Sequence, residues 1–396
     1  MDADSRGRGR FGKRWPLILW VLLLVLPAAA SGSSLTLPYS LEKIENSAFY
    51  GDSGITEVVL PVGIKSIGSN AFQACSNLRC ISIPATVTSI GTDAFKDTAE
   101  AFLIECDAES NAMEYALAKN IDFDADTVCR ALLIGNTDYR SGPTIYAPQY
   151  DIQTLGKTLS QQGKRSYEVT IREDLTASQI LEAVSNTFAD ADSGDISLFY
   201  FAGHGNYSLI AQENGALVGI DYSSYVYASD LRDALDAVKG RKIVIIDACY
   251  SGGLIGRGAD KEKGSISDPA RAFMDAFLNG SVTSETGKLL SRGDNLASNW
   301  YYVITAAKGT EKSFETSSSG KRFGLFTYFF SLGCGYDYLK DQFVAKQADS
   351  NQDGTVTLEE SYLYTYEAVQ SVTSQQGENQ TVQIFPEKCS WFGIIR

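Results

Sequence analysis

The sequence has almost no histidine and few basic residues. His204 is the only histidine in 396 residues, and 34 Lys and Arg stand against 48 Asp and Glu, giving a formal net charge of −14. A single histidine excludes a zinc site built from a Cys/His cluster. An acidic chain with no basic cluster outside its first 14 residues argues against nucleic acid or anionic lipid as the main partner. The acidic surplus suits cationic substrates or calcium.

The amino terminus is typical of a secretory signal. Five Arg and Lys precede the apolar stretch WPLILWVLLLVLP, which is followed by the small residues AAASGSS. We expect residues 1–30 to be removed by cleavage after Ala30, leaving a secreted or extracytoplasmic chain with no membrane association. A retained membrane anchor is the alternative, but the apolar run is shorter than the roughly 20 residues that a spanning helix needs.

Seven cysteines in an exported chain raise the question of disulfides. Seven is an odd number, so at least one thiol is unpaired within the chain, and the spacings fit no dense disulfide framework. The sequence leaves the pairing open for Cys75, Cys80, Cys106, Cys129, Cys249, Cys334 and Cys389.

Residues 35–124 repeat themselves with a period of 23. Isoleucine, alanine and phenylalanine recur at this spacing, at Ile44, Ile67 and Ile90, at Ala48, Ala71 and Ala94, and at Phe49, Phe72 and Phe95. A fixed period of this length predicts a small solenoid whose units bury their apolar faces against one another. The pattern resembles the leucine-rich repeats of bacterial surface proteins. Its expected role is to bind a protein ligand or to position the chain, and a structural cap without a ligand is an equally open alternative.

Residues 128–396 have a different pattern. The apolar runs CRALLIGN, DISLFYFAGHG, KIVIIDAC and WYYVITAAKG each end in small or polar residues. Helix-patterned segments lie between them at 150–159, 177–189 and 230–238. Continuous apolar runs separated by helices predict an α/β fold with a mostly parallel sheet flanked by helices. In such sheets the chemistry collects beyond the carboxyl ends of the strands.

His204 and Cys249 follow two successive predicted strands and are 45 residues apart. A thiol is a good nucleophile only as the thiolate, so it needs a neighbouring base, and His204 is the one imidazole available. Gly203 and Gly205 are expected to leave room for a substrate backbone. Either residue alone is more often structural, but the pair at two strand ends predicts a catalytic dyad.

The segments YFAGHG and IDACYSGG resemble the caspase-like cysteine peptidases, particularly the metacaspases. The resemblance implies a caspase fold and hydrolysis of peptide bonds, with Cys249 as the nucleophile and His204 as the acid and base. It also implies an oxyanion hole formed by the backbone N–H groups of Gly205 and Cys249. No third catalytic side chain and no organic cofactor are expected, and the partner is a protein or peptide substrate.

Asp247 is predicted to set the specificity. In an extended segment residues two apart face the same side, so Asp247 should lie beside Cys249. By the resemblance, an acid at this position accompanies cleavage after arginine or lysine. Asp151 matches a second acidic pocket residue of the metacaspase pattern, although it could equally be a carboxylate favoured at a helix start. Ala202 departs from the serine that metacaspases often have there.

The segment DSNQDGTVTLEE, residues 349–360, fits the loop of an EF-hand. Its candidate ligands for one weakly bound Ca²⁺ ion are Asp349, Asn351, Asp353, Thr355, Thr357 and Glu360. The alternative is an Asp/Asn-rich turn that binds no metal.

Two functions of different classes remain at this point. The first is an exported cysteine endopeptidase, and the second is a binding or adhesion protein that uses its repeats while the caspase-like part is a silent scaffold. The presence of both His204 and Cys249 favours the enzyme, because a scaffold needs neither.

Overall fold

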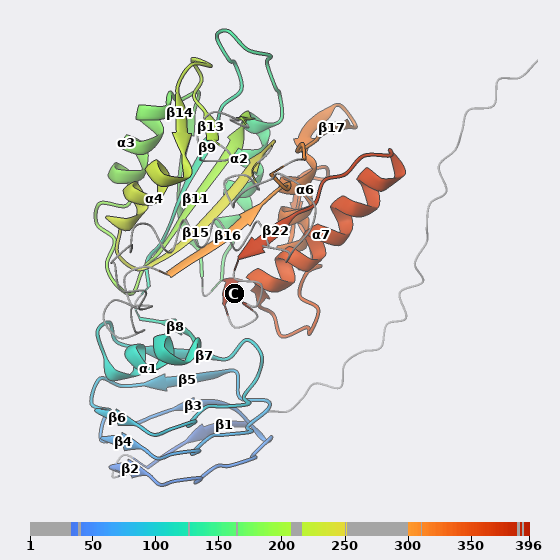
Figure 1. Cartoon of the computed structure of the whole chain (residues 1–396). Coiled ribbons are helices and arrows are strands. Elements are labelled where there is room, and N and C mark those ends of the chain that lie inside the picture. Colours follow the sequence, from blue (N-terminus) through green and yellow to red (C-terminus); the bar gives the residue numbers. More distant parts are fainter. Residues whose placement is uncertain are drawn as a thin grey trace, which may run out of the picture.

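The computed structural model describes residues 33–38, 41–125, 127–163, 165–206, 216–249, 251, 300–309, 311–385, 389 and 392–396. The predicted signal, residues 1–30, lies outside them. The described chain forms two units stacked end to end, with the repeats at one end and an α/β unit at the other (Figure 1). Among the described helices, none is both long and apolar enough to cross a membrane. All seven cysteines are described, and none of them forms a disulfide.

The repeat unit is a short solenoid of stacked strands. Its parallel sheet has the order β1-β3-β5-β7-β8, with β1 at Ser33–Thr36, β3 at Ile55–Val59, β5 at Cys80–Ile83, β7 at Leu103–Cys106 and β8 at Asp122–Asp124. A second ladder joins β2 (Lys43–Ile44), β4 (Ser66–Ile67) and β6 (Ser89–Ile90). The 23-residue period places equivalent side chains above one another, so the rings of Phe49, Phe72 and Phe95 stack with centroids 4.9 and 5.6 Å apart. Helix α1 (Asn111–Lys119) and β8 end the stack.

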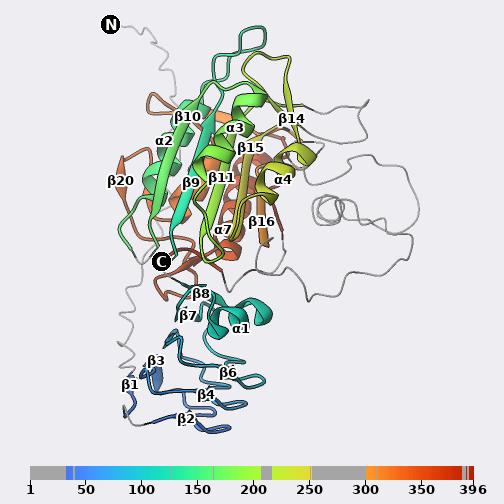
Figure 2. The same ribbon diagram turned by 90° about the vertical axis from the view of Figure 1, so that its left-hand side faces the viewer.

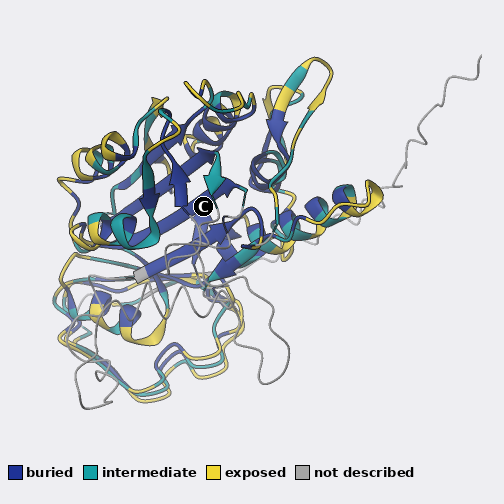
Figure 3. Cartoon of the chain, turned by 45° about the horizontal axis from the view of Figure 1, so that its top comes forward, coloured by how far each residue is buried: buried dark blue, intermediate teal, exposed yellow. Residues whose placement is uncertain are grey.

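The α/β unit is built on a six-stranded sheet of order β10-β9-β11-β15-β16-β22, in which only the β22 edge is antiparallel. The strands are β9 (Cys129–Gly135), β10 (Tyr167–Glu173), β11 (Ile196–Gly203), β15 (Arg241–Ala248), β16 (Trp300–Thr305) and β22 (Gln383–Phe385). Every residue of β11 and β15 is buried (Figure 3), which is why these central strands read as continuous apolar runs.

Helices cover both faces of this sheet (Figures 1 and 2). Helices α2 (Pro148–Leu159), α6 (Leu325–Gly333) and α7 (Leu358–Gln375) share one hydrophobic core with the sheet. Helices α3 (Ala177–Thr187) and α4 (Ala228–Asp236) form the core on the other face. Short strands complete the unit: β12 (Gly205–Asn206), β13 (Ala216–Val218), β14 (Tyr225–Tyr227), β17 (Glu315–Ser318), β18 (Lys321–Gly324), β19 (Tyr336–Asp337), β20 (Gln342–Phe343), β21 (Val356–Thr357) and β23 (Gly393–Ile395).

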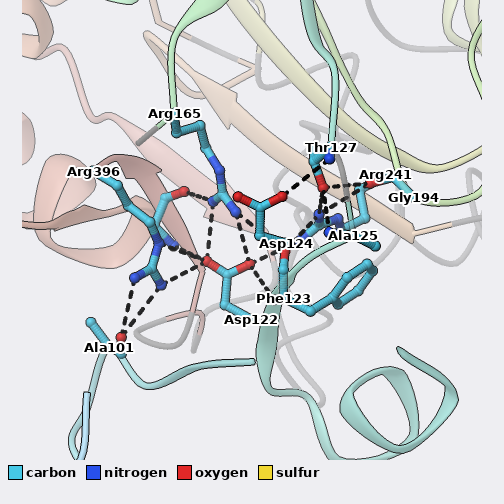
Figure 4. Close-up of polar contacts among 11 residues, drawn as sticks. Ala101, Asp122, Phe123, Asp124, Ala125, Thr127, Arg165, Gly194, Arg241 and Arg396 are labelled. Carbon is cyan, nitrogen blue, oxygen red and sulfur yellow. Dashed lines mark hydrogen bonds and ion pairs between the residues drawn. The ribbon is translucent and has the colours of Figure 1, made fainter. Parts of the chain in front are cut away.

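A buried carboxylate joins the two units. Asp122, on the last strand of the repeats, is fully buried and lies among three arginines of the α/β unit (Figure 4). Its Oδ1 accepts from Arg241 at 2.8 Å, and its Oδ2 accepts from Arg165 at 3.1 Å and from Arg396 at 2.9 Å. Burial alone would raise the pKa of Asp122, but the three guanidinium charges hold it well below its ordinary value.

The repeats therefore dock against the amino ends of the parallel strands. Arg241 begins β15, and its guanidinium also donates to the carbonyl of Phe123 at 3.0 Å and lies 3.9 Å from the centre of the Phe123 ring. Because catalytic groups in such sheets gather at the carboxyl ends, the repeats lie at the opposite end of the sheet from the predicted dyad.

We expect Asp122→Ala to destabilise the whole chain. The change leaves Arg396 and two buried arginines, Arg165 and Arg241, without their shared counter-charge, and breaking a buried charge pair typically costs about 3–5 kcal/mol. Because the pKa of Asp122 is lowered on folding, its contribution is present above the unfolded-state pKa and is lost as pH falls through the folded-state pKa. Urea unfolding at several pH values measures both effects.

The control variant is Lys43→Ala, which removes an exposed ion pair with Glu45 and should change stability by less than about 1 kcal/mol. An Asp122→Ala protein as stable as the wild type would contradict the structural role given to this cluster.

Candidate active site

The pairing of β11 with β15 brings the two predicted dyad residues side by side. Ala202 pairs with Asp247 and Gly203 with Ala248, so the residues that follow, His204 and Cys249, come next to each other in the same register. Both line a cavity of about 90 Å³ at the carboxyl ends of the strands. The other lining residues are Ile145, Ala147, Pro148, Asp151, Ala202, Gly203, Asp247, Ala248, Ser313, Phe314, Glu315 and Gly324.

A backbone carbonyl orients His204. The Nε2 atom lies 2.8 Å from the carbonyl oxygen of Pro143, and because a carbonyl can only accept, Nε2 must donate and carry the proton. Neutral imidazole then has Nδ1 free to accept a proton. Tyr139 holds the same residue through its hydroxyl, which accepts the His204 backbone N–H at 2.7 Å, and through its ring, 4.5 Å from the imidazole.

Cys249 lies partly buried at the end of β15. Its Sγ lies 3.6 Å from the carbonyl oxygen of Ser313. Burial raises the pKa of the Cys249 thiol, and the nearby charge of Asp247 raises it further. The thiol form is therefore favoured in the empty site, and the nucleophile needs a base to take its proton during attack.

The two glycines beside His204 have a different role from the one predicted. A Cβ at Gly205 would come within 1.9 Å of the Cys249 carbonyl oxygen, and one at Gly203 within 2.7 Å of the Tyr139 hydroxyl. The expectation that they leave room for a substrate backbone is wrong, because the protein itself fills that space. Glycine at 205 instead allows the ends of β11 and β15 to approach each other.

Two buried carboxyl groups form the floor of the cavity. Asp247 is 7% exposed and accepts from the hydroxyls of Ser313 at 2.6 Å and Thr327 at 2.7 Å. Asp151 is 2% exposed, belongs to the first turn of α2 and accepts the Gly324 N–H at 3.0 Å. A Cβ at Gly324 would lie within 3 Å of an oxygen of each carboxyl group. Because glycine has no Cβ, both carboxyl groups can lie against the backbone at this residue.

Burial and neighbouring charges raise the pKa values of Asp151 and Asp247. Burial raises the pKa of Asp151 well above its ordinary value, and the charges of Asp247 and Glu315 add to the rise. Burial also raises the pKa of Asp247, while its two hydroxyl donors partly oppose the change. The residues that line the pocket include no lysine or arginine. A cation entering it would favour the ionised form of each acid.

Glu315 is a third acidic residue of the pocket, and the sequence analysis did not predict it. Its Oε2 accepts the N–H groups of Tyr146 and Ala147, both at 2.9 Å, just before the helix that carries Asp151. Glu315 thus adds a third carboxylate and fixes the start of that helix. In the sequence, Glu315 is only an acidic residue at the start of a short extended segment, and that pattern does not predict a pocket residue unless the fold is known.

The predicted calcium loop adopts a tight turn before α7. Gly354, at the sixth position, has φ +88°, a conformation that favours glycine. Asp349 accepts the N–H groups of Asp353 at 3.0 Å and Gly354 at 2.9 Å, and Asn351 also accepts the Asp353 N–H. Thr355 donates its N–H to Asp353 at 2.8 Å.

Thr357 and Glu360, the last two candidate ligands, form hydrogen bonds with each other. Glu360 Oε2 accepts the N–H and the hydroxyl of Thr357, both at 3.0 Å, in a capping box at the start of α7. In the part of the chain that the structure describes, no group of three or more His, Cys, Asp and Glu is arranged to hold a metal.

Burial raises the pKa of Asp349, and the charges of Asp353 and Glu360 also raise it, so a bound cation would relieve this repulsion.

The comparisons with known proteins identify the family. A model described as the caspase domain matches residues 128–392, which is more than half of the chain. The chain belongs to the caspase-domain family. A second model, the BspA type leucine rich repeat region, matches residues 29–119 in six copies. The predicted resemblance and the predicted fold class are thereby confirmed.

Individual relatives cover only part of this caspase-domain protein. Over 75 residues it is 39% identical to the human mucosa-associated lymphoid tissue lymphoma translocation protein 1, a match covering 19% of this chain and 9% of that protein. Caspase-1 from Spodoptera frugiperda superimposes with a TM-score of 0.40 at 13% identity, over 65% of this chain and 87% of its own. Protein GSU0716 from Geobacter sulfurreducens superimposes with a TM-score of 0.39 at 13% identity, over 65% of this chain and 92% of its own.

Proposed function

We propose that this caspase-domain protein is a cysteine endopeptidase that cleaves after arginine or lysine by a dyad of Cys249 and His204. The observation that carries the specificity is a small pocket beside both residues that is lined by three carboxyl groups and by no lysine or arginine. A side chain with a positive charge would supply the missing counter-charge. Membership of a cysteine peptidase family supports the reaction class.

The geometry supports the following sequence of steps. The Cys249 thiol passes its proton to Nδ1 of His204 while the sulfur attacks the substrate carbonyl carbon, and the carbonyl oxygen becomes an oxyanion. The backbone N–H groups of Gly205 and Cys249 are the proposed donors to that oxyanion. His204 then gives its proton to the leaving amine as the C–N bond breaks. Water attacks the thioester, which releases the acid and restores the thiol.

Arginine and lysine at the residue before the scissile bond should be preferred by a large factor. The aliphatic stem of either side chain can pass the apolar wall of Ile145 and Phe314, while the charged end meets Asp151 and Asp247. Aspartate at this position would add another unpaired negative charge to a desolvated site. Since removing one member of such a charge pair costs about 2–5 kcal/mol, the discrimination should be at least about 30-fold.

The test uses the purified chain and fluorogenic peptides that differ only in the residue before the cleaved bond. Arginine and lysine peptides should be hydrolysed, and aspartate, glutamine and leucine peptides should react at least about 30-fold more slowly in kcat/KM. A preference for aspartate would refute the pocket assignment but not the dyad. No hydrolysis of any peptide would favour the alternative, a binding protein whose repeats carry the function.

The repeats support a protein partner in either case. Because they dock at the end of the sheet opposite the cavity, we propose that they position the peptidase or bind a protein partner away from the cleavage site. We also propose that the chain is exported after removal of residues 1–30. Sequencing the amino terminus of the mature protein tests that cleavage.

We propose one weak calcium site in the loop of residues 349–360, formed by Asp349, Asn351, Asp353 and Glu360. The match of the loop sequence and the raised pKa of Asp349 beside the charges of Asp353 and Glu360 support it, and affinity in the extracellular range, about 10⁻⁴–10⁻³ M, is expected of a single loop. At 10 mM Ca²⁺ mass action should then stabilise the chain by roughly 1.4–2.7 kcal/mol. Thermal unfolding with Ca²⁺ and, as the control, with Mg²⁺ measures this. An unchanged melting temperature in Ca²⁺ would mean that the loop is a turn without a metal.

A further inference from the structure

We propose that Tyr222 contacts the substrate residue that follows the scissile bond and makes the enzyme prefer a large apolar or aromatic side chain there. This inference rests on the proposed peptidase function and adds a second specificity site to it. Tyr222 lies in the turn between β13 and β14, two strands at the top of the sheet in Figure 1, and its ring contacts that of His204, which lines the cavity.

Tyr222 lies against the catalytic base. Its ring meets the His204 ring edge to face, with centroids 5.6 Å apart and an angle of 79° between the planes. The same ring meets Tyr139 at 5.7 Å. Tyr139 is 4% exposed and belongs to a small core with Val218 and Ile220, whereas Tyr222 is 37% exposed, so part of this residue is accessible beside His204.

The backbone at this residue is unusual for a tyrosine. Tyr222 has φ +60°, the left-handed region that bulky side chains rarely adopt and that glycine or asparagine would occupy more easily. Conformations of this kind cluster at functional sites, where the surrounding structure holds them. Here the backbone N–H donates to the Gly219 carbonyl at 2.8 Å. The ring also packs so closely on Gly142 that a Cβ there would lie 2.4 Å from it. The ring is therefore fixed in place before a substrate binds.

The chemistry of the reaction decides which part of a substrate meets this ring. His204 must donate its proton to the leaving amine, and that nitrogen belongs to the residue after the scissile bond. The side chain of that residue consequently lies on the His204 side of the cleaved bond. The residue before the bond occupies the acidic pocket, and the residues lining that pocket do not include Tyr222. A fixed, exposed ring in this position offers an aromatic or large aliphatic side chain a surface on which to pack.

Internally quenched peptides test the inference. They share one sequence ending in arginine before the cleaved bond and carry phenylalanine, leucine, glycine or aspartate after it. Wild type should favour phenylalanine and leucine over glycine by about three- to tenfold in kcat/KM, the value of one aromatic contact. Tyr222→Asn removes the ring but tolerates the positive φ, so the ratio should fall to about one. Tyr222→Phe keeps the ring and should keep the ratio.

An arginine methyl ester serves as the matched control substrate. Its leaving group is methanol, which gives Tyr222 nothing to pack against, so the ester rate of Tyr222→Asn reports only the effect of the change on His204, and the peptide rates are compared relative to it. If the variant loses activity equally on the ester and on every peptide, the ring only positions His204 and the inference is wrong. A wild type without any preference after the scissile bond also overturns it, while the peptidase function stands. Failure of the wild type on every substrate overturns the function and this inference together.

Discussion

Replacing Cys249 with alanine should abolish peptide hydrolysis, with kcat/KM falling roughly 10⁴-fold or more, as expected when a nucleophile is removed. The reason is that the scissile carbonyl would be attacked only by water, although the pocket and the base remain. The measurement is the rate on the arginine peptide, with iodoacetamide labelling of the wild type as a second readout. Cys106→Ala is the matched control.

Cys106 is a free thiol in the repeats whose pKa burial raises to about 12, so its removal should leave the rate unchanged. His204→Ala should also lose most activity, by about 10²–10⁴-fold, because the thiol then has no base. Since burial raises the pKa of Cys249, any residual activity of this variant should increase as pH rises above the ordinary thiol range. Cys249→Ala protein with wild-type activity, free of contaminating peptidase, would overturn the dyad.

The fold and the position of the chemistry could be predicted from local patterns. A strand buried on both faces must be apolar throughout, and β11 and β15 are buried at every position, so both could be read directly. Parallel strands in register then place their carboxyl ends together, which brings His204 beside Cys249. The 23-residue period likewise predicted the stacked phenylalanines.

Contacts between distant segments could not be predicted in this way. Asp122 binds arginines 43, 119 and 274 residues further along the chain, and nothing near any of them marks the partnership. The orienting group of His204 is the main-chain carbonyl of Pro143, which every residue type would supply. Glu315 enters the pocket only because β17 and β18 fold back towards α2. The periodic pattern predicted how the repeats stack, but not the surface by which they dock.

Asp247→Asn should remove most of the preference for basic residues. In the wild type, burial raises the pKa of Asp247, and two hydroxyl donors, Ser313 and Thr327, oppose the rise by stabilising its carboxylate, which is almost fully buried. A substrate arginine would pair with that charge, and loss of one member of a desolvated pair costs about 2–5 kcal/mol, or roughly 30- to 5000-fold in kcat/KM. The ratio of arginine to norleucine peptides should fall by this factor, while the rate on norleucine changes little.

Asp151→Asn is the comparison variant, because it tests whether the preference for arginine depends more on Asp247 than on the second acid of the pocket. Burial and the charge of Asp247 raise the pKa of Asp151 well above its ordinary value, so the ionised form of Asp151 is disfavoured and a neutral amide in its place changes the pocket less. Its replacement should therefore lower the arginine preference by less than the replacement of Asp247 does. Because a bound cation favours ionised Asp151, the wild type should release a proton when it binds an arginine aldehyde, and Asp151→Asn should release less. Equal arginine preference in the wild type and in Asp247→Asn would mean that the acidic pocket does not receive the residue before the scissile bond.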